Sequence, residues 1–140
     1  MSNELLNTTG SYATAQAASS TANGVMSVGT VSTIATAISA EQKYLFLDFR
    51  VNISVGTPVA GGVIDIFRRA GDGTNQAPIP QVADFLDKWV GGVLVDNATG
   101  FYYFYGVDNP DPNDSYYMLN RGGATLTLTL AVRGRTPGNV

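Results

Sequence analysis

The stretch that decides the fold is Tyr44–Val55, which reads YLFLDFRVNISV. Every second side chain from position 45 is apolar, and the side chains between them are polar from Asp48 onward. Because successive side chains of a β-strand point to opposite faces, this alternation predicts one long strand with a buried face and a solvated face. Tyr44 and Phe46 lie on the otherwise polar side, so we expect both rings to be covered by the N-terminal segment or by a neighbouring subunit.

Further apolar stretches, separated by Gly, Pro, Asn and Asp, follow this strand toward the C-terminus. Residues 124–133 alternate as cleanly as the first strand, and we expect the even-numbered side chains from Leu126 to Val132 to point inward. The other expected strands cover residues 63–70, 89–95, 101–107 and 115–119.

Two further segments have recognisable local patterns. Gly91 and Gly92 interrupt one expected strand, which indicates a bulge or a close backbone approach. Residues 82–88 fit one helical turn that places Phe85 or Leu86 against the core. Because no long amphipathic helix separates the strands, the sequence predicts an all-β, antiparallel sandwich of two sheets, of jelly-roll or immunoglobulin-like kind, with about seven to eight strands.

Residues 1–40 differ in composition from the rest of the chain, because more than half of them are Ala, Ser or Thr. Such small side chains bury too little area to offset backbone ordering, which costs about 1–2 kcal/mol per residue. We therefore expect an extended N-terminal arm that assembly contacts hold in place. A helix over residues 13–22 would be marginal, and residues 25–39 suit a first strand. The sandwich domain is expected over 41–134, and a polar tail over 135–140.

The composition excludes several classes of function. The chain has 140 residues, a net charge of −3, and neither Cys nor His. Disulfides, thiol nucleophiles and Ser-His-Asp catalysis are therefore excluded, and we expect no enzyme and no cofactor. The eight basic residues form no cluster for nucleic acid, and no apolar run is long enough for a membrane span. The first residues lack the pattern of a secretory signal, so we expect synthesis and assembly in the cytoplasm.

The aromatic run Phe101–Tyr105 is apolar on both faces of its expected strand. Tyr102 and Phe104 share one face, and Tyr103 and Tyr105 share the other. One face must belong to the core. The other fits a cover made by the domain's own loops or arm, a subunit interface, or a platform on which sugars stack.

Acidic side chains suggest two further sites. Asp108, Asp111 and Asp114 could bind calcium together with backbone carbonyls, although a solvated acidic turn explains their spacing better. Asp84, Asp87 or the acidic loop at 108–114 could supply a carboxylate pair for glycoside hydrolysis, but nothing in the sequence places two carboxylates across a cleft.

The order of segments resembles small virion proteins of tailed bacteriophages that have a jelly-roll fold. The resemblance covers roughly residues 28–133 as a pattern of segments. The segments that carry it are 31–38 (VSTIATAI), 45–51 (LFLDFRV), 56–62 (GTPVAGG), 63–67 (VIDIF), 72–74 (DGT) and 120–123 (NRGG), the last of which occupies the place where the group often has an Asn-x-x-Gly segment.

The resemblance implies a structural function and no catalytic residues. We expect a capsid decoration or cement protein, a homotrimer that binds the major capsid protein or other virion proteins and stabilises capsomer contacts. Deleting residues 1–24 should then abolish capsid binding and leave a folded sandwich. The alternative is a receptor- or carbohydrate-binding module of a tail or head fibre, which would use the Tyr-rich strand and the loops at 71–81 and 108–114.

Overall fold

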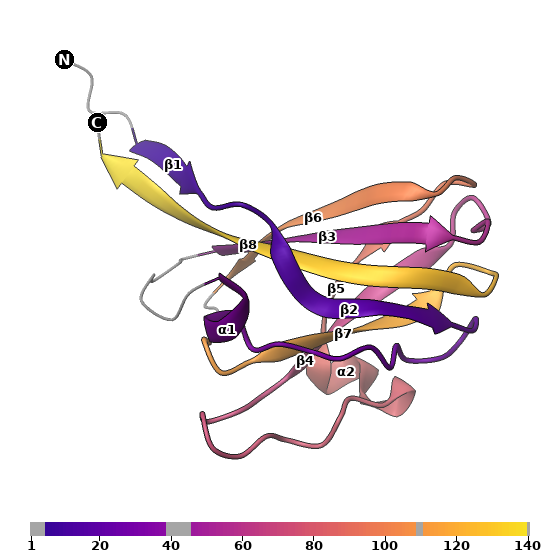
Figure 1. Cartoon of the computed structure of the whole chain (residues 1–140), viewed down its shortest axis with the longest axis horizontal. Coiled ribbons are helices and arrows are strands. Elements are labelled where there is room, and N and C mark those ends of the chain that lie inside the picture. Colours follow the sequence, from indigo (N-terminus) through magenta and orange to yellow (C-terminus); the bar gives the residue numbers. More distant parts are fainter. Residues whose placement is uncertain (1–4, 39–45, 109–110, 140) are drawn as a thin grey trace.

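The structure, a computed structural model, describes residues 5–38, 46–108 and 111–139. These residues form eight strands in two antiparallel sheets (Figure 1), which confirms the predicted all-β sandwich. The strands are β1 (Leu5–Thr9), β2 (Ala13–Thr21), β3 (Phe46–Val55), β4 (Val63–Arg69), β5 (Trp89–Leu94), β6 (Gly100–Asp108), β7 (Ser115–Arg121) and β8 (Leu126–Asn139). The helical segments are α1 (Ile34–Ile38), the 3-10 turn η1 (Val82–Asp84) and α2 (Phe85–Lys88).

The connectivity is that of a jelly roll. The large sheet has the order β2-β8-β3-β6, with β1 following β2 along the same edge of β8, and the small sheet has the order β5-β4-β7. Met26 forms an isolated bridge with Leu119 of β7, so residues 24–27 lie where a fourth strand of the small sheet would be. With this segment included, the strand orders β2-β8-β3-β6 and 24–27-β7-β4-β5 are those of an eight-stranded jelly roll.

The core lies between the two sheets and follows the predicted alternation. The apolar side chains at odd positions of β3 from Leu47 to Ile53 and at even positions of β8 are buried, as are Ile64 and Ile66 of β4, whereas Val55 at the end of β3 is 62% exposed. Across the sandwich, the rings of Phe49 and Tyr116 meet edge to face with centroids 4.7 Å apart. Each such fully buried side chain contributes about 1.5–3 kcal/mol through removal of apolar area from water.

The N-terminal segment is organised differently from the expected arm. Residues 13–21 form strand β2, which pairs with β8, because the exposed edge of β8 satisfies their backbone groups and Ala15 is small enough to lie fully buried against the core. Between residues 25 and 38, the expected first strand is replaced by bridges at Met26 and Val31 and by α1. This segment crosses from one sheet to the other, so it cannot continue along either edge.

Among the described residues, the large sheet thus extends beyond the expected domain limits of 41 and 134 on both sides, because β2 pairs with β8. Residues 135–139 are the last part of β8 and pair with β1 instead of forming a polar tail. Figure 1 shows β1 and this end of β8 leaving the body of the sandwich as a two-stranded ribbon. Only this ribbon has the extended character expected of an arm.

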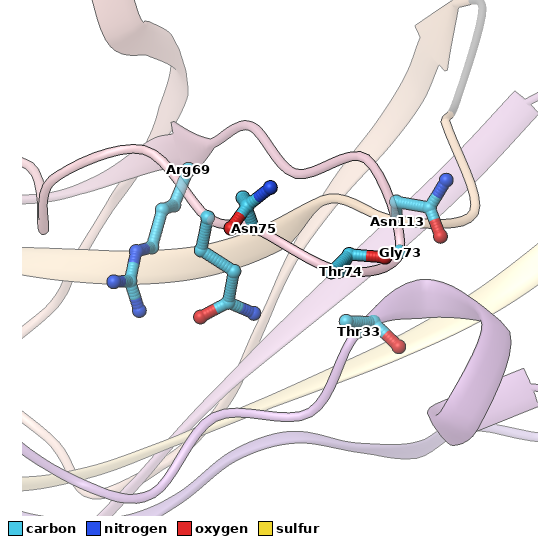
Figure 2. A pocket seen from close by; sticks show the side chains of 7 residues that line it. Thr33, Arg69, Gly73, Thr74, Asn75 and Asn113 are labelled. Carbon is cyan, nitrogen blue, oxygen red and sulfur yellow. The ribbon is translucent and has the colours of Figure 1, made fainter.

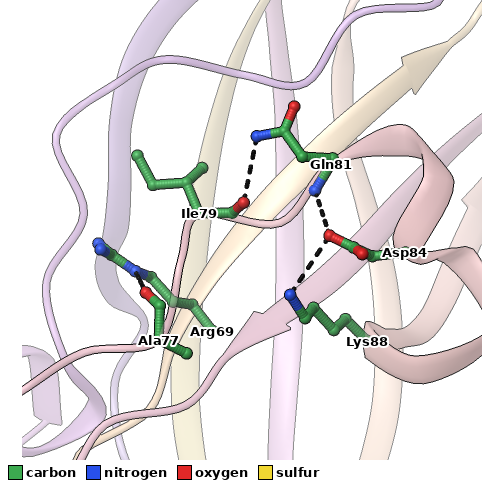
Figure 3. Close-up of polar contacts among 6 residues, drawn as sticks. All are labelled: Arg69, Ala77, Ile79, Gln81, Asp84 and Lys88. Carbon is green, nitrogen blue, oxygen red and sulfur yellow. Dashed lines mark hydrogen bonds and ion pairs between the residues drawn. The ribbon is translucent and has the colours of Figure 1, made fainter.

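The β4–β5 connection is held by a chain of polar contacts (Figure 3). The Arg69 Nε donates to the carbonyl of Ala77 at 2.6 Å, and Asp84 accepts from the Gln81 amide at 2.7 Å and from the Lys88 Nζ at 3.3 Å. The helical turn predicted over residues 82–88 is present. The ring of Phe85 covers that of Phe67, with centroids 5.4 Å apart, whereas Leu86 is 98% exposed.

Candidate functional site

The aromatic strand β6 forms one edge of the large sheet and separates its rings between two faces. Tyr102 and Phe104 are partly buried and pack against the core. Phe101, Tyr103 and Tyr105 point the other way and are 53%, 47% and 56% exposed. Of the four interface candidates on this strand, only Tyr103 and Tyr105 are therefore available to a partner.

The other two candidates lie at the start of β3. Tyr44 lies outside the described residues. Phe46 is partly buried, and the guanidinium of Arg135 lies 5.2 Å from the centre of its ring. The cover over Phe46 thus comes in part from strand β8.

Arginine side chains lie over the exposed rings on the outer face of the large sheet. The guanidinium of Arg50 lies 4.8 Å from the ring centre of Tyr12 and 4.5 Å from that of Phe101. Arg133 lies 4.9 Å from the ring centre of Tyr12 and 5.9 Å from that of Tyr105. Cation–π contacts at exposed sites contribute about 0.5–1 kcal/mol each, so the rings and cations hold one another in place.

The tyrosines of this face also contact one another. Tyr103 and Tyr105 are stacked, with ring centroids 5.9 Å apart and planes within 7° of parallel. Tyr12 meets Tyr103 at 6.0 Å with a tilt of 57°. The aromatic–arginine platform is defined by six residues from four adjacent segments: Tyr12, Arg50, Phe101, Tyr103, Tyr105 and Arg133.

Asp48 fixes the arginines at the base of the platform. Its carboxylate is fully buried and accepts from Arg133 Nε at 3.0 Å, from Arg135 Nη2 at 3.3 Å and from the backbone amide of Gly106 at 3.1 Å. The sequence pattern places Asp48 on the solvated face of its strand, but the long arginine side chains cover it. Burial of an ion pair costs free energy unless hydrogen bonds compensate, and here they do.

The platform is positively charged, although the whole chain is not. Arg50 and Arg133 of the platform and the neighbouring Arg135 contribute three positive charges, against the single carboxylate of Asp48 that pairs with Arg133 and Arg135, in a chain whose net charge is −3. Such a face favours a partner that supplies carboxylates or backbone carbonyls.

Sequence reasoning missed Tyr12 and the arginines. Tyr12 stands alone in a polar segment, and only the pairing of Ala13 with Val132 places it beside Arg133. Burial raises the pKa of the Tyr12 hydroxyl above its usual value, and the charge of Arg133 opposes this effect. The hydroxyl therefore remains protonated at neutral pH.

Asp111 and Asp114 lie in one turn, where the backbone amide of Asp114 donates to the carbonyl of Asp111 at 3.0 Å. No group of three His, Cys, Asp or Glu side chains that could hold a metal occurs among the described residues. Asp111 accepts from the amide of Asn113 at 2.8 Å, and Asp114 forms an ion pair with Arg68 at 3.6 Å. The side chain of Asp108 lies outside the described residues, so the calcium hypothesis stays a prediction.

The surroundings of Asp114 and Asp84 shift the pKa values of these two carboxyl groups in opposite directions. Burial raises the pKa of Asp114 to about 6, against the lowering effect of Arg68. Asp84 takes part in the contacts of Figure 3, where the Gln81 amide holds its pKa below the usual value. Asp87 is exposed, and nothing pairs it with Asp84 across a cleft.

Comparisons with known proteins assign no function to this chain. No protein-family model, no curated protein and no solved structure matches the chain. None of the described helices is both long and apolar enough to cross a membrane. Fold and surface together define a small jelly-roll protein with a cationic, tyrosine-rich sheet face.

Proposed function

We propose that this protein is a structural component of a bacteriophage virion, a capsid decoration protein that docks through its aromatic–arginine platform. The observation that carries the proposal is the placement of exposed Tyr rings and paired Arg side chains on one sheet face. Tyr and Arg are the residues most enriched in the energetic centres of protein interfaces.

The rings of the platform suit a polypeptide partner. Tyr103 and Tyr105 face each other along β6, so they present edges and hydroxyl groups to solvent. The guanidinium of Arg133 is held by Asp48, so little side-chain entropy remains to be lost when a partner binds. A partner face rich in carbonyls and carboxylates, such as a surface of the major capsid protein, would complement these donors.

The projecting ribbon favours assembly into a homo-oligomer. β1 pairs with β8 through five residue pairs, from Leu5–Asn139 to Thr9–Arg135. A two-stranded ribbon on its own is only marginally stable in water, because it buries little apolar surface. Contact with a neighbouring copy would supply the missing surface, and a closed homotrimer on the virion is the arrangement that we propose.

A carbohydrate-binding module is the second candidate, and the platform fits it less well. A sugar ring stacks on a free aromatic face. Here Tyr103 and Tyr105 cover each other, and the guanidinium of Arg50 lies over Phe101. A glycan would have to displace these contacts before it could stack on the strand.

The proposal is tested on purified particles of the phage that encodes the chain. Mass spectrometry should detect the protein in the particles, and sedimentation should give the mass of a trimer in solution. If the protein is absent from the particles, the virion assignment is wrong. A monomer at the concentrations at which the protein binds particles would exclude the trimer.

A variant series then tests the platform itself. The double substitution Tyr103→Ser/Tyr105→Ser should lower binding to particles that lack the protein by at least about 30-fold, the loss typical of interface hot spots. Leu94→Ser is the matched control, because Leu94 is 73% exposed on a strand of the other sheet. Circular dichroism verifies that both variants fold, and equal binding by the double variant and wild type would refute docking through the platform.

A further inference from the structure

A polar pocket of about 370 Å³ lies beside α1, between the loop that follows β4 and the loop that precedes β7 (Figure 2). It shares no residue with the aromatic–arginine platform. Its lining consists of Thr33, Arg69, Gly73, Thr74, Asn75, Gln76 and Asn113. Two hydroxyls, three amides and one guanidinium thus line the pocket, without a carboxylate or an aromatic ring.

The carboxylates of the surrounding loops are engaged by other groups. Asp72 accepts from the amides of Thr74 at 2.9 Å and Asn75 at 2.6 Å, and these bonds hold its pKa below the usual value. Asp111 and Asp114 are held by Asn113 and Arg68, as described above. These carboxylates keep their negative charge, but their oxygens are directed to these partners, and Arg69 is the only charged residue among the described residues that line the pocket.

Arg69 is fixed in position by contacts to two of its three guanidinium nitrogens. Its Nε donates to the Ala77 carbonyl at 2.6 Å (Figure 3), and its Nη1 lies 3.5 Å from the hydroxyl of Tyr117. Its Nη2 has no hydrogen-bond partner among the described residues. A guanidinium held in this way presents its remaining donors in a fixed direction, which suits a carboxylate.

The loop that carries most of the lining is rigid. The backbone of Asp72 donates to the Asn75 carbonyl at 3.0 Å, and that of Ala77 donates to the Ala70 carbonyl at 2.9 Å. A Cβ at Gly71 would come within 2.7 Å of the Asn113 carbonyl oxygen, so the two loops are in close contact. A site formed by such loops loses little conformational freedom on binding.

We propose that this pocket binds a carboxylate-bearing sugar residue of an acidic saccharide. Arg69 would take the carboxylate, and the side chains of Thr74, Gln76 and Asn113 would exchange hydrogen bonds with ring hydroxyls. Amides and hydroxyls match a sugar because each both donates and accepts. The volume suits a small ligand of one or two rings. This activity is independent of docking through the platform.

A titration followed by amide NMR shifts tests the ligand class. The probes are methyl glucuronoside, methyl glucoside and acetate, which separate the acidic sugar from its neutral counterpart and from a simple anion. We expect saturable shifts at residues 73–76 and 113, with the glucuronoside bound at least about tenfold more tightly than either other probe. Shifts elsewhere, no saturation, or equal binding of all three probes would overturn the proposal.

Variants of the lining separate binding from folding. Arg69→Gln should lower glucuronoside affinity by at least about tenfold, and Thr74→Val, which removes one exposed hydroxyl, by about threefold. Lys88→Gln removes a cation and Thr125→Val a hydroxyl outside the pocket, so both variants should bind as wild type does. Should Arg69→Gln fail to fold, Thr74→Val and Asn113→Ala decide the result. Wild-type affinity in the folded lining variants would refute the site.

The platform variant Tyr103→Ser/Tyr105→Ser should retain glucuronoside binding.

Discussion

The ring of Phe104 lies directly against the backbone of Gly91, so that a Cβ built at Gly91 would come 2.1 Å from the ring's Cζ. Phe104 belongs to β6 of the large sheet and Gly91 to β5 of the small sheet. The contact therefore joins the two sheets at the side where β5 and β6 meet. Glycine is required here for close approach, as expected of the Gly91–Gly92 pair.

The substitution Gly91→Ala should destabilise the fold by about 1–3 kcal/mol, the cost typical of an overpacked core. Urea denaturation measures this loss. In a Phe104→Leu background the smaller side chain leaves room for the added methyl group, so Gly91→Ala should cost less than about 0.5 kcal/mol there. Equal costs in both backgrounds would show that the ring does not set the requirement for glycine.

Removal of the carboxylate beneath the platform should be costly. Asp48→Asn leaves Arg133 and Arg135 without their shared anion, and because both arginines are only partly exposed we expect a loss of about 2–3 kcal/mol in the free energy of unfolding. Asp87→Asn, at an exposed carboxylate, should leave stability unchanged. A similar effect of the two substitutions would contradict the proposed role of Asp48.

The pH dependence of stability should carry a signature of Asp114. Burial raises its folded-state pKa to about 6, whereas in the unfolded chain the carboxyl group titrates near its ordinary pKa of 3.8. Between these values the folded state binds more protons, so this group makes stability fall as the pH rises from about 4 to about 6. We expect its contribution to be about 1–2 kcal/mol after allowance for solvent screening.

Asp114→Asn isolates that contribution. The amide resembles the protonated carboxyl, so the difference in stability between variant and wild type should shift in favour of the variant as the pH rises through this range. Chemical denaturation at pH 4, 5, 6 and 7 measures it, with Asp87→Asn as the control. A difference that does not change with pH would show that the folded and unfolded pKa values of Asp114 are alike.

The sequence predicts the sandwich because its two longest strands are half buried. In β3 and β8, apolar and polar residues alternate along the strand, so the sequence of each strand alone indicates which face is buried. The N-terminal segment gives no such signal, because Ala, Ser and Thr are accepted on either face of a sheet. Its strand β2 exists because the edge of β8 is available, which is a property of a distant part of the chain.

The aromatic–arginine platform could not be predicted from the sequence, because it also depends on contacts between distant parts of the chain. Asp48 lies directly opposite Arg133, and Arg50 opposite Tyr103, only through the registers of β3 with β8 and with β6. A sequence contains the charges and rings but not these registers. The exposed pair Tyr103 and Tyr105 could be named in advance because both belong to a single strand whose two faces are apolar.

Truncation tests whether the two-stranded ribbon and strand β2 contribute differently to the stability of the fold. Deleting residues 1–9 removes β1 and should leave cooperative thermal unfolding intact, because β1 pairs only with the end of β8. Deleting residues 1–24 also removes β2, with the buried Ala15 and Gln16, and uncovers the edge of β8. In contrast to the expectation from the sequence, this longer deletion should abolish cooperative unfolding. A cooperative transition in both truncated chains would show that β2 is dispensable.

Asn120 links β2 to the turn before β8 through a fully buried amide. Its Nδ2 donates to the carbonyls of Thr21 and Ala124, both at 2.8 Å, and its Oδ1 accepts from the Gly122 amide at 2.8 Å. Asn120→Ala leaves these three backbone groups without their partner, so we expect a loss of about 2–4 kcal/mol in the free energy of unfolding.

Asn120→Asp tests the direction of those hydrogen bonds. The variant has the same shape, but at neutral pH it directs a carboxylate oxygen at two carbonyl oxygens, so it should cost more than Asn120→Ala. In acid the carboxyl group is protonated and can donate one of the two bonds, so the difference between the variants should narrow as the pH falls. Urea denaturation at pH 7 and pH 4 measures both effects, with Asn97→Asp at an exposed turn as the control. If Asn120→Asp were no more costly than Asn120→Ala at pH 7, the amide would not be the donor that holds β2 to this turn.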